Sequence, residues 1–206
     1  MCGIIGINSN KEVTSTILNS LRKLEYRGYD SAGIATLNSG YIQEVKCEGR
    51  VDNLEKNIIK NKLLGNVGIG HVRWATHGIP STLNAHPHSS DNVSVVHNGI
   101  IENSTLLKKF LVKKGHRFKS QTDTEVIVHL ITEYLKKNNL IDTLTKVLKK
   151  LHGSFALGII FKDEPDLIVG ARRGSPLAVG YGPGENYLDS YALKSMTNKI
   201  TYLDDG

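Results

Sequence analysis

The sequence has little cysteine and no long apolar run. It contains two cysteines, Cys2 and Cys47, among 206 residues, which is too few for a disulfide framework or a four-ligand zinc site. The start of the chain lacks a basic segment followed by an apolar one, so we expect no secretory signal, and no stretch is long enough to span a bilayer. Residue 2 is not glycine, which excludes N-myristoylation. These absences predict a cytoplasmic protein with no membrane partner.

Acidic residues are fewer than basic ones, and the formal net charge is +6. Such a charge is compatible with nucleic-acid binding. However, the lysines occur in separated pairs within or at the ends of predicted helices, and no aromatic-rich strand of the RNA-binding type accompanies them. We therefore interpret them as solvated helix faces and predict no nucleic-acid partner. The pairs are Lys108–Lys109, Lys113–Lys114, Lys136–Lys137 and Lys149–Lys150.

Hydrophobic residues make up 39% of the chain, which is enough for one core, so we expect a single domain over residues 1–206. Apolar periodicity predicts helices at 11–24, 51–64, 103–114, 124–137 and 141–151. Short apolar runs predict strands at 2–7, 34–37, 41–45, 67–72, 94–97, 154–161, 166–171, 177–181 and 199–203. Strands and helices come in groups, which favours sheets packed together with helices outside over strict β-α alternation.

Cys2 begins an apolar strand and would become the first residue if Met1 were removed. Its α-amino group would then have a reference pKa of about 7.7–8.0, against about 8.5 for the thiol. The amine is therefore a suitable base near neutral pH for activating the thiol as a nucleophile. The alternative, which position alone favours, is a small buried residue without a chemical role.

Attack on an amide also needs hydrogen-bond donors for the oxyanion. The stretch His97-Asn98-Gly99 follows the predicted strand 94–97 and offers the Asn98 side-chain amide and the Gly99 backbone N–H. The alternative is a hairpin, because Asn-Gly is the commonest hairpin turn. Residues 100–103 lead into a predicted helix and not into a returning strand, which weakens that alternative.

A substrate with an amino-acid head needs one cation and one anion. Arg73 can hold a carboxylate with two parallel hydrogen bonds, and Asp123 can bind an ammonium group. The alternative for Arg73 is a surface salt bridge. Asp123 lies just before a predicted helix, so it could equally be the N-cap of that helix, and the two roles are compatible.

Five histidines invite a metal-site interpretation. Their spacing matches no known ligand set and no second cysteine lies nearby, so we predict no metal. These histidines are His71, His77, His86, His88 and His97.

Five motifs occur in order along the chain: CGI at 2–4, LEYRGYDSAG at 24–33, RWATHG at 73–78, NAHPH at 84–88 and HNGIIEN at 97–103. With these motifs the chain resembles, over essentially all of residues 1–206, the glutaminase domain of the glutamine–fructose-6-phosphate aminotransferases. These are class II glutamine amidotransferases of the N-terminal-nucleophile hydrolase superfamily. The resemblance implies an α+β fold, a four-layer αββα sandwich.

The resemblance also implies a role for each candidate residue. Cys2 would be the nucleophile after loss of Met1, Asn98 and Gly99 would form the oxyanion hole, and Arg73 and Asp123 would bind the carboxylate and ammonium of glutamine. The remaining residues would line or support the site: Thr76 and His77 in the loop that closes the pocket, Trp74 as a gate for ammonia, Arg27 beside the terminal cysteine, and His86 nearby.

The implied reaction is hydrolysis of the side-chain amide of L-glutamine through a thioester, without a metal or an organic cofactor. In the family, sugar-isomerase domains use the ammonia to convert fructose 6-phosphate to glucosamine 6-phosphate. Such a domain is expected in the full enzyme or as a separate chain, and the alternative is that residues 1–206 act as a plain glutaminase. A catalytically silent module on the same fold is the alternative, and the complete set Cys2, Arg73, Asn98, Gly99 and Asp123 favours the enzyme.

Overall fold

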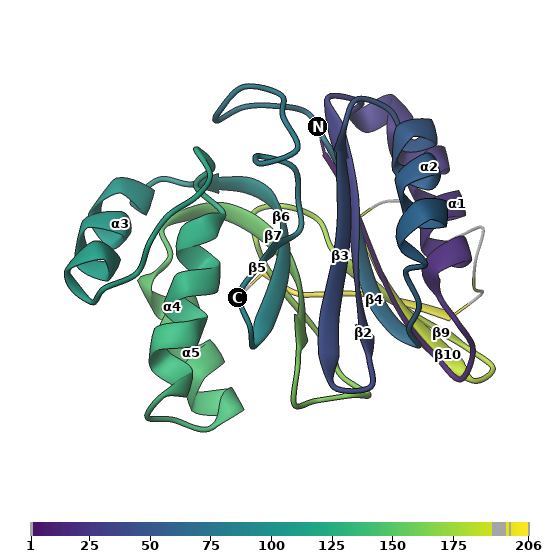
Figure 1. The fold of residues 1–206 in the computed structure, drawn as a ribbon. Coiled ribbons are helices and arrows are strands. Elements are labelled where there is room, and N and C mark those ends of the chain that lie inside the picture. The colour runs from purple at the N-terminus through teal and green to yellow at the C-terminus, as the bar shows by residue number, and fades with distance from the viewer. Residues whose placement is uncertain (1, 191–196, 198, 206) are drawn as a thin grey trace.

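Two antiparallel sheets face each other, and helices cover the outer face of each sheet (Figure 1). This computed structural model describes residues 2–190, 197 and 199–205. Each sheet must bury both faces, one against its helices and one against the other sheet. The result is a four-layer αββα sandwich, which confirms the predicted fold class.

The larger sheet has seven strands in the order β11-β9-β10-β1-β4-β2-β3. The first strands along the chain are β1 (Gly3–Ser9), β2 (Ser31–Asn38), β3 (Tyr41–Glu48) and β4 (Val67–Arg73). The last are β9 (Ala178–Gly182), β10 (Glu185–Asp189) and β11 (Lys199–Tyr202). Its outer face is covered by α1 (Thr14–Leu24) and α2 (Val51–Asn61), and a short 3-10 helix, η1 (Glu25–Arg27), follows α1.

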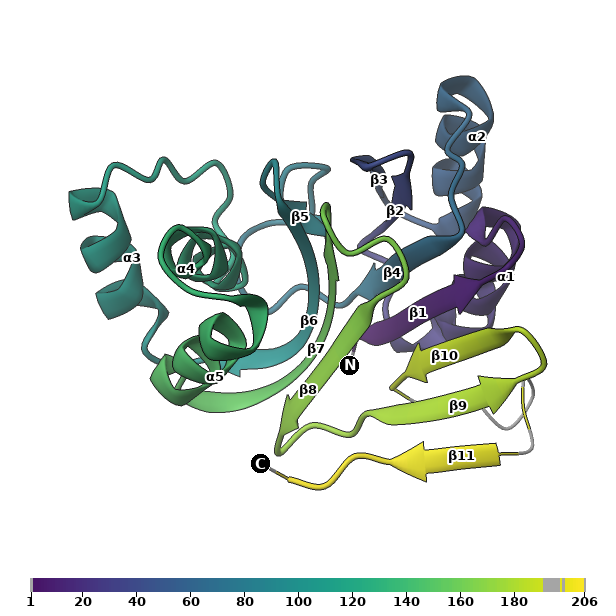
Figure 2. The same ribbon diagram turned by 90° about the horizontal axis from the view of Figure 1, so that it is seen from below.

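The smaller sheet has four strands in the order β5-β6-β7-β8. They are β5 (His88–Ser89), β6 (Val93–Ile101), β7 (Gly153–Phe161) and β8 (Ile168–Arg173). Three helices lie on the side away from the larger sheet, as Figure 2 shows. They are α3 (Ser104–Lys113), α4 (Glu125–Leu135) and α5 (Leu140–Lys150).

Strand β4 shows how the sequence builds the layer between the sheets. Successive side chains of a strand point to opposite faces, and Val67 and Ile69 pack in the apolar cluster between the two sheets while Val72 packs under the helices. The same alternation places His71 and Arg73 on the inner face. The inner face of β4 is therefore apolar at Val67 and Ile69 and becomes polar at His71 and Arg73, at the end of the strand.

The largest difference from the sequence prediction lies in β6. We expected the strand to end at His97, but it runs to Ile101, and Asn98 and Gly99 pair with Ala156 and Phe155 of β7. The hairpin alternative for Asn-Gly is therefore wrong, because pairing with β7 overrides the local turn preference. Strands β5 and β10 were not predicted, since one is two residues long and the other has polar residues at both ends.

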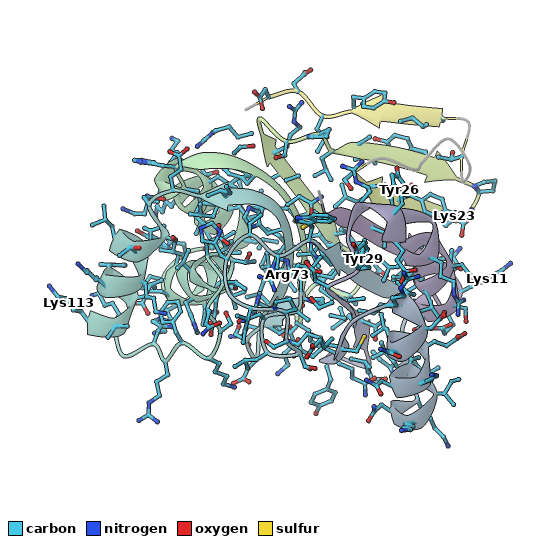
Figure 3. The ribbon with its side chains drawn as sticks, turned by 90° about the horizontal axis from the view of Figure 1, so that it is seen from above. Lys11, Lys23, Tyr26, Tyr29, Arg73 and Lys113 are labelled. Carbon is cyan, nitrogen blue, oxygen red and sulfur yellow. The ribbon has the colours of Figure 1, made fainter. Side chains whose placement is uncertain are left out.

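The predicted lysine pairs are all exposed. Lys113 lies in the last turn of α3, and Lys149 and Lys150 lie in the last turn of α5, where positive charge is favourable beside the helix dipole. Figure 3 shows Lys11 and Lys113 at opposite ends of the molecule. The interpretation as solvated helix faces is confirmed. Within the described part of the chain, none of the helices has the length and apolar character needed to cross a membrane.

Candidate active site

A cavity of about 320 Å³ opens where the ends of β1, β4 and β6 come together. Every candidate residue from the sequence lines it: Cys2, Arg27, Arg73, Trp74, Thr76, His77, His86, Asn98, Gly99 and Asp123. Figure 3 shows Arg73 near the centre of the molecule, between the two halves of the sandwich. The fold thus gathers residues from distant parts of the chain around one hollow.

Cys2 is held by four hydrogen bonds just ahead of β1. The Cys2 thiol donates to the Trp74 carbonyl oxygen at 3.5 Å. The Trp74 backbone N–H donates to the Cys2 Sγ at 3.2 Å. The Cys2 carbonyl accepts from Asn98 Nδ2 at 3.2 Å and from Arg27 Nε at 3.0 Å. Burial raises the pKa of the Cys2 thiol above its ordinary value. The thiol is therefore protonated at neutral pH and needs a base before it can act as a nucleophile.

Asn98 and Gly99 lie in β6 beside this thiol. The Oδ1 of Asn98 is 3.0 Å from His71 Nε2, which leaves Nδ2 toward Cys2. Gly99 has a φ of +128°, and an added Cβ would lie 2.1 Å from the Ser154 carbonyl oxygen. Only glycine fits there without moving the backbone of β7. Both residues line the cavity, and Asn98 Nδ2 donates to the Cys2 carbonyl oxygen.

The Arg73 side chain is only 4% exposed, so the surface salt bridge considered for it is excluded. Its Nη2 donates to the carbonyl oxygens of His77 and Gly78. Its Nη1 is buried and has no hydrogen-bond partner among the described residues. A buried guanidinium with unused donors costs free energy unless an anion binds it. This atom is therefore a candidate anchor for a carboxylate in the cavity.

Asp123 also lines the cavity and is 9% exposed. Its Oδ2 accepts a hydrogen bond from the Ile101 N–H at 2.7 Å. Helix α4 begins at Glu125 with Thr124 at its N-cap position, so the N-cap interpretation of Asp123 is wrong. The carboxylate instead connects the loop before α4 to the end of β6 and presents negative charge to the cavity.

The segment from Trp74 to Gly78 forms the exposed side of the cavity. Thr76 and His77 are exposed, and their side chains lie 3.3 Å apart between Oγ1 and Nδ1. The Trp74 ring is 47% exposed and meets Tyr29 edge-on, with 6.0 Å between ring centroids. This side is a loop that covers the cavity with side chains making few contacts.

Several residues of the site were not anticipated. Asp30 Oδ2 accepts from the Ala75 N–H at 2.6 Å and so ties the exposed loop to the start of β2. Its position inside the motif at 24–33 was a signal that could have found it. Ser175, Pro176 and Ser190 also line the cavity. Ser175 and Pro176 follow β8, and Ser190 follows β10. None of them belongs to a sequence motif, so their place in the site is seen only in the folded structure.

The description "Glutamine amidotransferase domain" belongs to the family model that matches residues 71–197. The chain belongs to this family. It is 52% identical, over its whole length, to the glutamine–fructose-6-phosphate aminotransferase [isomerizing] of Zymomonas mobilis, and 53% identical to that of Mesorhizobium japonicum. In each comparison the chain spans 34% of the relative, or about a third of its length.

Solved structures agree with this glutamine amidotransferase assignment. The glutamine phosphoribosylpyrophosphate amidotransferase of B. subtilis, in complex with ADP and GMP, superposes with a TM-score of 0.83 at 28% identity. The alignment covers 98% of this chain and 44% of that one. A structure described as the allosteric regulatory enzyme of purine biosynthesis gives a TM-score of 0.82 at 28% identity. The αββα sandwich is thus the N-terminal-nucleophile hydrolase fold of the glutamine amidotransferases.

The histidines of this amidotransferase domain are not arranged as metal ligands. In the described ranges, no group of three or more His, Cys, Asp or Glu side chains is placed to hold a metal ion. Instead, His86 accepts a hydrogen bond at Nδ1 from the His97 N–H at 3.3 Å, and its Nε2 is 3.2 Å from Thr124 Oγ1. His86 thus lines the cavity as part of a buried hydrogen-bonded layer beneath it.

Proposed function

We propose that this domain hydrolyses the side-chain amide of L-glutamine to glutamate and ammonia, with Cys2 as the nucleophile. One observation carries the proposal: a single cavity is lined by the partly buried Cys2, by Asn98 and Gly99, and by Arg73, whose buried Nη1 has an unused donor. A glutamine molecule needs all three, because its amide must meet the thiol while its carboxylate is held at a distance.

The charged residues of the cavity select an amino acid. Arg73 Nη1 would donate to the α-carboxylate, and Asp123 would accept from the α-ammonium group. Arg73 at the end of β4 and Asp123 just before α4 thus bring two opposite charges to one cavity. Thr76 and His77 would complete the pocket from the exposed loop, and Arg27 would support the Cys2 main chain through its hydrogen bond to the carbonyl.

The reaction proceeds in two steps. If Met1 is removed, the free amine of Cys2 takes the thiol proton, the sulfur attacks the side-chain carbonyl carbon, and Asn98 Nδ2 and the Gly99 N–H bind the oxyanion. The amine then gives its proton to the leaving nitrogen, ammonia departs, and a γ-glutamyl thioester remains. Water attacks the thioester, which releases glutamate and restores the thiol. Neither step calls for a metal or an organic cofactor. Met1 lies outside the described residues, so its removal stays a prediction.

The relatives suggest where the ammonia goes. Their names pair glutamine with fructose 6-phosphate, and about two-thirds of their length lies beyond the part that this chain matches. We infer that residues 1–206 are the glutaminase domain and that a sugar-isomerase domain, in a longer polypeptide or a separate chain, uses the ammonia to make glucosamine 6-phosphate. Trp74 at the exposed side of the cavity would gate the ammonia. Both cysteines are free, which supports a cytoplasmic location.

The test combines intact mass with turnover. Loss of Met1, one adduct from a diazo-ketone analogue of glutamine, and glutamate release from L-glutamine are the expected results. The Cys2→Ala variant should lose both adduct and turnover, whereas Cys47→Ala, which changes the buried cysteine of β3, should keep both. A retained Met1 without an adduct would overturn the mechanism. Turnover that persists in Cys2→Ala would overturn the nucleophile.

The silent-module alternative makes a different prediction. Such a module would bind glutamine or a partner without forming a covalent adduct at Cys2. The intact cavity and the unused donor of Arg73 support the enzyme. An adduct on Cys2 without turnover would mean that the site is formed and requires the sugar-isomerase domain for hydrolysis.

A further inference from the structure

His71 connects the two sheets directly beneath the cavity. It lies in β4 of the larger sheet, and its Nε2 faces two oxygen atoms of β6 in the smaller sheet. These are the His97 carbonyl oxygen at 3.1 Å and Asn98 Oδ1 at 3.0 Å. Both oxygens can only accept a hydrogen bond. The Nε2 must therefore carry a hydrogen.

We propose that His71 is a positioning residue for the oxyanion hole, whose Nε2–H tautomer fixes the Asn98 side chain with Nδ2 toward Cys2. The proposal rests on the function proposed above, since it concerns the donor that would bind the oxyanion of the glutamine reaction. His71 does not line the cavity itself and acts through Asn98.

The two possible orientations of the Asn98 amide differ in their hydrogen bonds. In the observed orientation, Oδ1 accepts from His71 and one hydrogen of Nδ2 goes to the Cys2 carbonyl, 3.2 Å away. The second Nδ2 hydrogen is then available to the oxyanion. If the amide were flipped, Nδ2 would face the Nε2–H of His71, and Oδ1 would face the Cys2 carbonyl. Both contacts would be repulsive, so the His71 donor and the Cys2 carbonyl together select the orientation that the proposed reaction needs.

The surroundings of His71 keep its ring neutral. The side chain is fully buried, and burial lowers its pKa to about 3, with the nearby charge of Arg73 acting in the same direction. Nδ1 has no hydrogen-bond partner among the described residues. With the proton fixed on Nε2, Nδ1 is the unprotonated nitrogen, which is the state that a buried site without a partner tolerates best.

The neighbouring histidines follow the same pattern of protons. The His71 ring packs on His86 with 4.3 Å between centroids. His86 Nδ1 accepts from the His97 N–H, so the His86 proton is on Nε2 and donates to Thr124 Oγ1. The Thr124 hydroxyl can then donate to His97 Nδ1, 2.9 Å away. The hydrogen-bond partners thus place the proton of His71 and of His86 on Nε2, whereas His97 Nε2 has no hydrogen-bond partner among the described residues, so the tautomer of His97 is not fixed by this network.

The first experiment reads the tautomer in the unmutated protein. Nitrogen-15 NMR of histidine-labelled protein, assigned by comparison with His71→Gln, should show His71 protonated at Nε2 and unprotonated at Nδ1 from pH 5 to 8. Protonation at Nδ1, or a second proton on the ring within this range, would overturn the proposal. This measurement needs no turnover, so it is independent of the proposed function.

The second experiment is a double-mutant cycle on glutamine hydrolysis. His71→Leu removes the donor at similar volume and should lower kcat about 10- to 100-fold with KM within about threefold, because loss of an oxyanion-hole donor costs about 10²–10³ in kcat. His71→Gln places an N–H donor at the same number of bonds from the backbone and should stay within about fivefold of the unmutated kcat. Thermal melting checks that each variant is folded.

The cycle distinguishes positioning from a merely structural role. In an Asn98→Ala background, His71→Leu should change kcat by less than about threefold, since its effect runs through the missing amide. An effect as large as in the unmutated background, or no rescue by glutamine at position 71, would overturn the proposal. The exposed His152→Leu is the matched control and should leave kcat unchanged. If the unmutated protein neither labels at Cys2 nor hydrolyses glutamine, the proposed function fails, and the NMR result alone decides the tautomer.

Discussion

The two sides of the cavity are built in different ways. The strand-end side consists of Cys2 and Asn98, with His71 beneath them, and their contacts connect the start of β1 with β4 and β6 across the two sheets. The loop side consists of Trp74, Thr76 and His77, whose side chains are exposed. His71 is 0% exposed and Trp74 is 47% exposed. Thus the donors that would stabilise the oxyanion are fixed in advance, while the residues that would cover the substrate are held mainly by their backbone.

This difference predicts different kinetic consequences. Donors that are already oriented stabilise charge as it develops, so disturbing the strand-end side should lower kcat. Groups that hold the substrate in both the ground state and the transition state mainly determine KM. Arg73 belongs to both sides, because it ends β4 and its Nη2 donates to the backbone of the loop at His77 and Gly78.

Of the changes considered, Asn98→Ala on the strand-end side should lower activity most. It removes the side-chain donor that we propose for the oxyanion and should lower kcat for glutamine hydrolysis about 10²- to 10³-fold, with little change in KM. Steady-state glutamate release measures both constants. The exposed Asn92→Ala, just before β6, is the control and should behave like the unmutated protein. A rise in KM with kcat unchanged would place Asn98 in substrate binding instead.

Arg73→Lys should affect both sides, with the larger effect on binding. Lysine keeps the positive charge but loses the planar pair of donors, so the carboxylate anchor and the bonds to the loop cannot both be made. We expect KM for glutamine to rise about 30- to 100-fold, with a smaller fall in kcat. Arg117→Lys changes an exposed arginine outside the cavity and serves as the control. Unchanged KM would remove Arg73 from substrate binding.

Glu125→Gln tests the support beneath Asp123. Burial alone would raise the pKa of the Glu125 carboxyl. The nearby His129 ring, whose Nε2 lies 3.4 Å from Oε1, and hydrogen bonds from the Lys119 and Ser120 backbones and the Ser120 hydroxyl lower it to about 2. A carboxylate with a lowered pKa stabilises the fold above its ordinary pKa of 4.5. That stability is lost as the pH falls toward 2.

We therefore expect Glu125→Gln to lower the free energy of unfolding by about 2 kcal/mol at pH 7. The difference from the unmutated protein should shrink below pH 4.5. Urea unfolding at several pH values measures it, and the exposed Glu164→Gln is the control. A difference that is independent of pH would mean that packing, and not the charge of Glu125, is responsible.

The parts predicted from sequence are those determined by local patterns. The apolar spacing of α1 predicts Ile17 and Leu21 on its buried face, and both are fully buried. The motifs also contain most of the residues that line the cavity, although Asp123, Ser175, Pro176 and Ser190 lie outside them. What could not be predicted depends on pairing between distant segments. Asn98 and Gly99 form a strand because β7 lies beside them.

His71 shows the same limit within the site. Its alternation with Ile69 and Arg73 places it on the inner face of β4, but this pattern does not reveal that Asn98 Oδ1 lies opposite on another sheet. A polar side chain at a buried position of such an alternating strand pattern nevertheless indicates that a hydrogen-bond partner lies nearby. A buried polar group at the end of an apolar face must have a partner, and the partner is found where the strands end.

Trp74→Ala should have the smallest effect on activity. The residue contributes to both sides of the cavity, through its backbone to one and through its ring to the other. The backbone N–H of residue 74 donates to the Cys2 Sγ and belongs to the strand-end side, whereas the ring is exposed and belongs to the loop side. Removing the ring leaves the backbone contact, so kcat/KM for glutamine hydrolysis should change less than about fivefold and stability by less than about 0.5 kcal/mol. Tyr29→Ala removes the ring that contacts Trp74 edge-on and should have an equally small effect on kcat/KM and stability. A loss of 100-fold or more would instead assign the indole to the fixed side, because only a group that orients Cys2 or the oxyanion donors has an effect of that size.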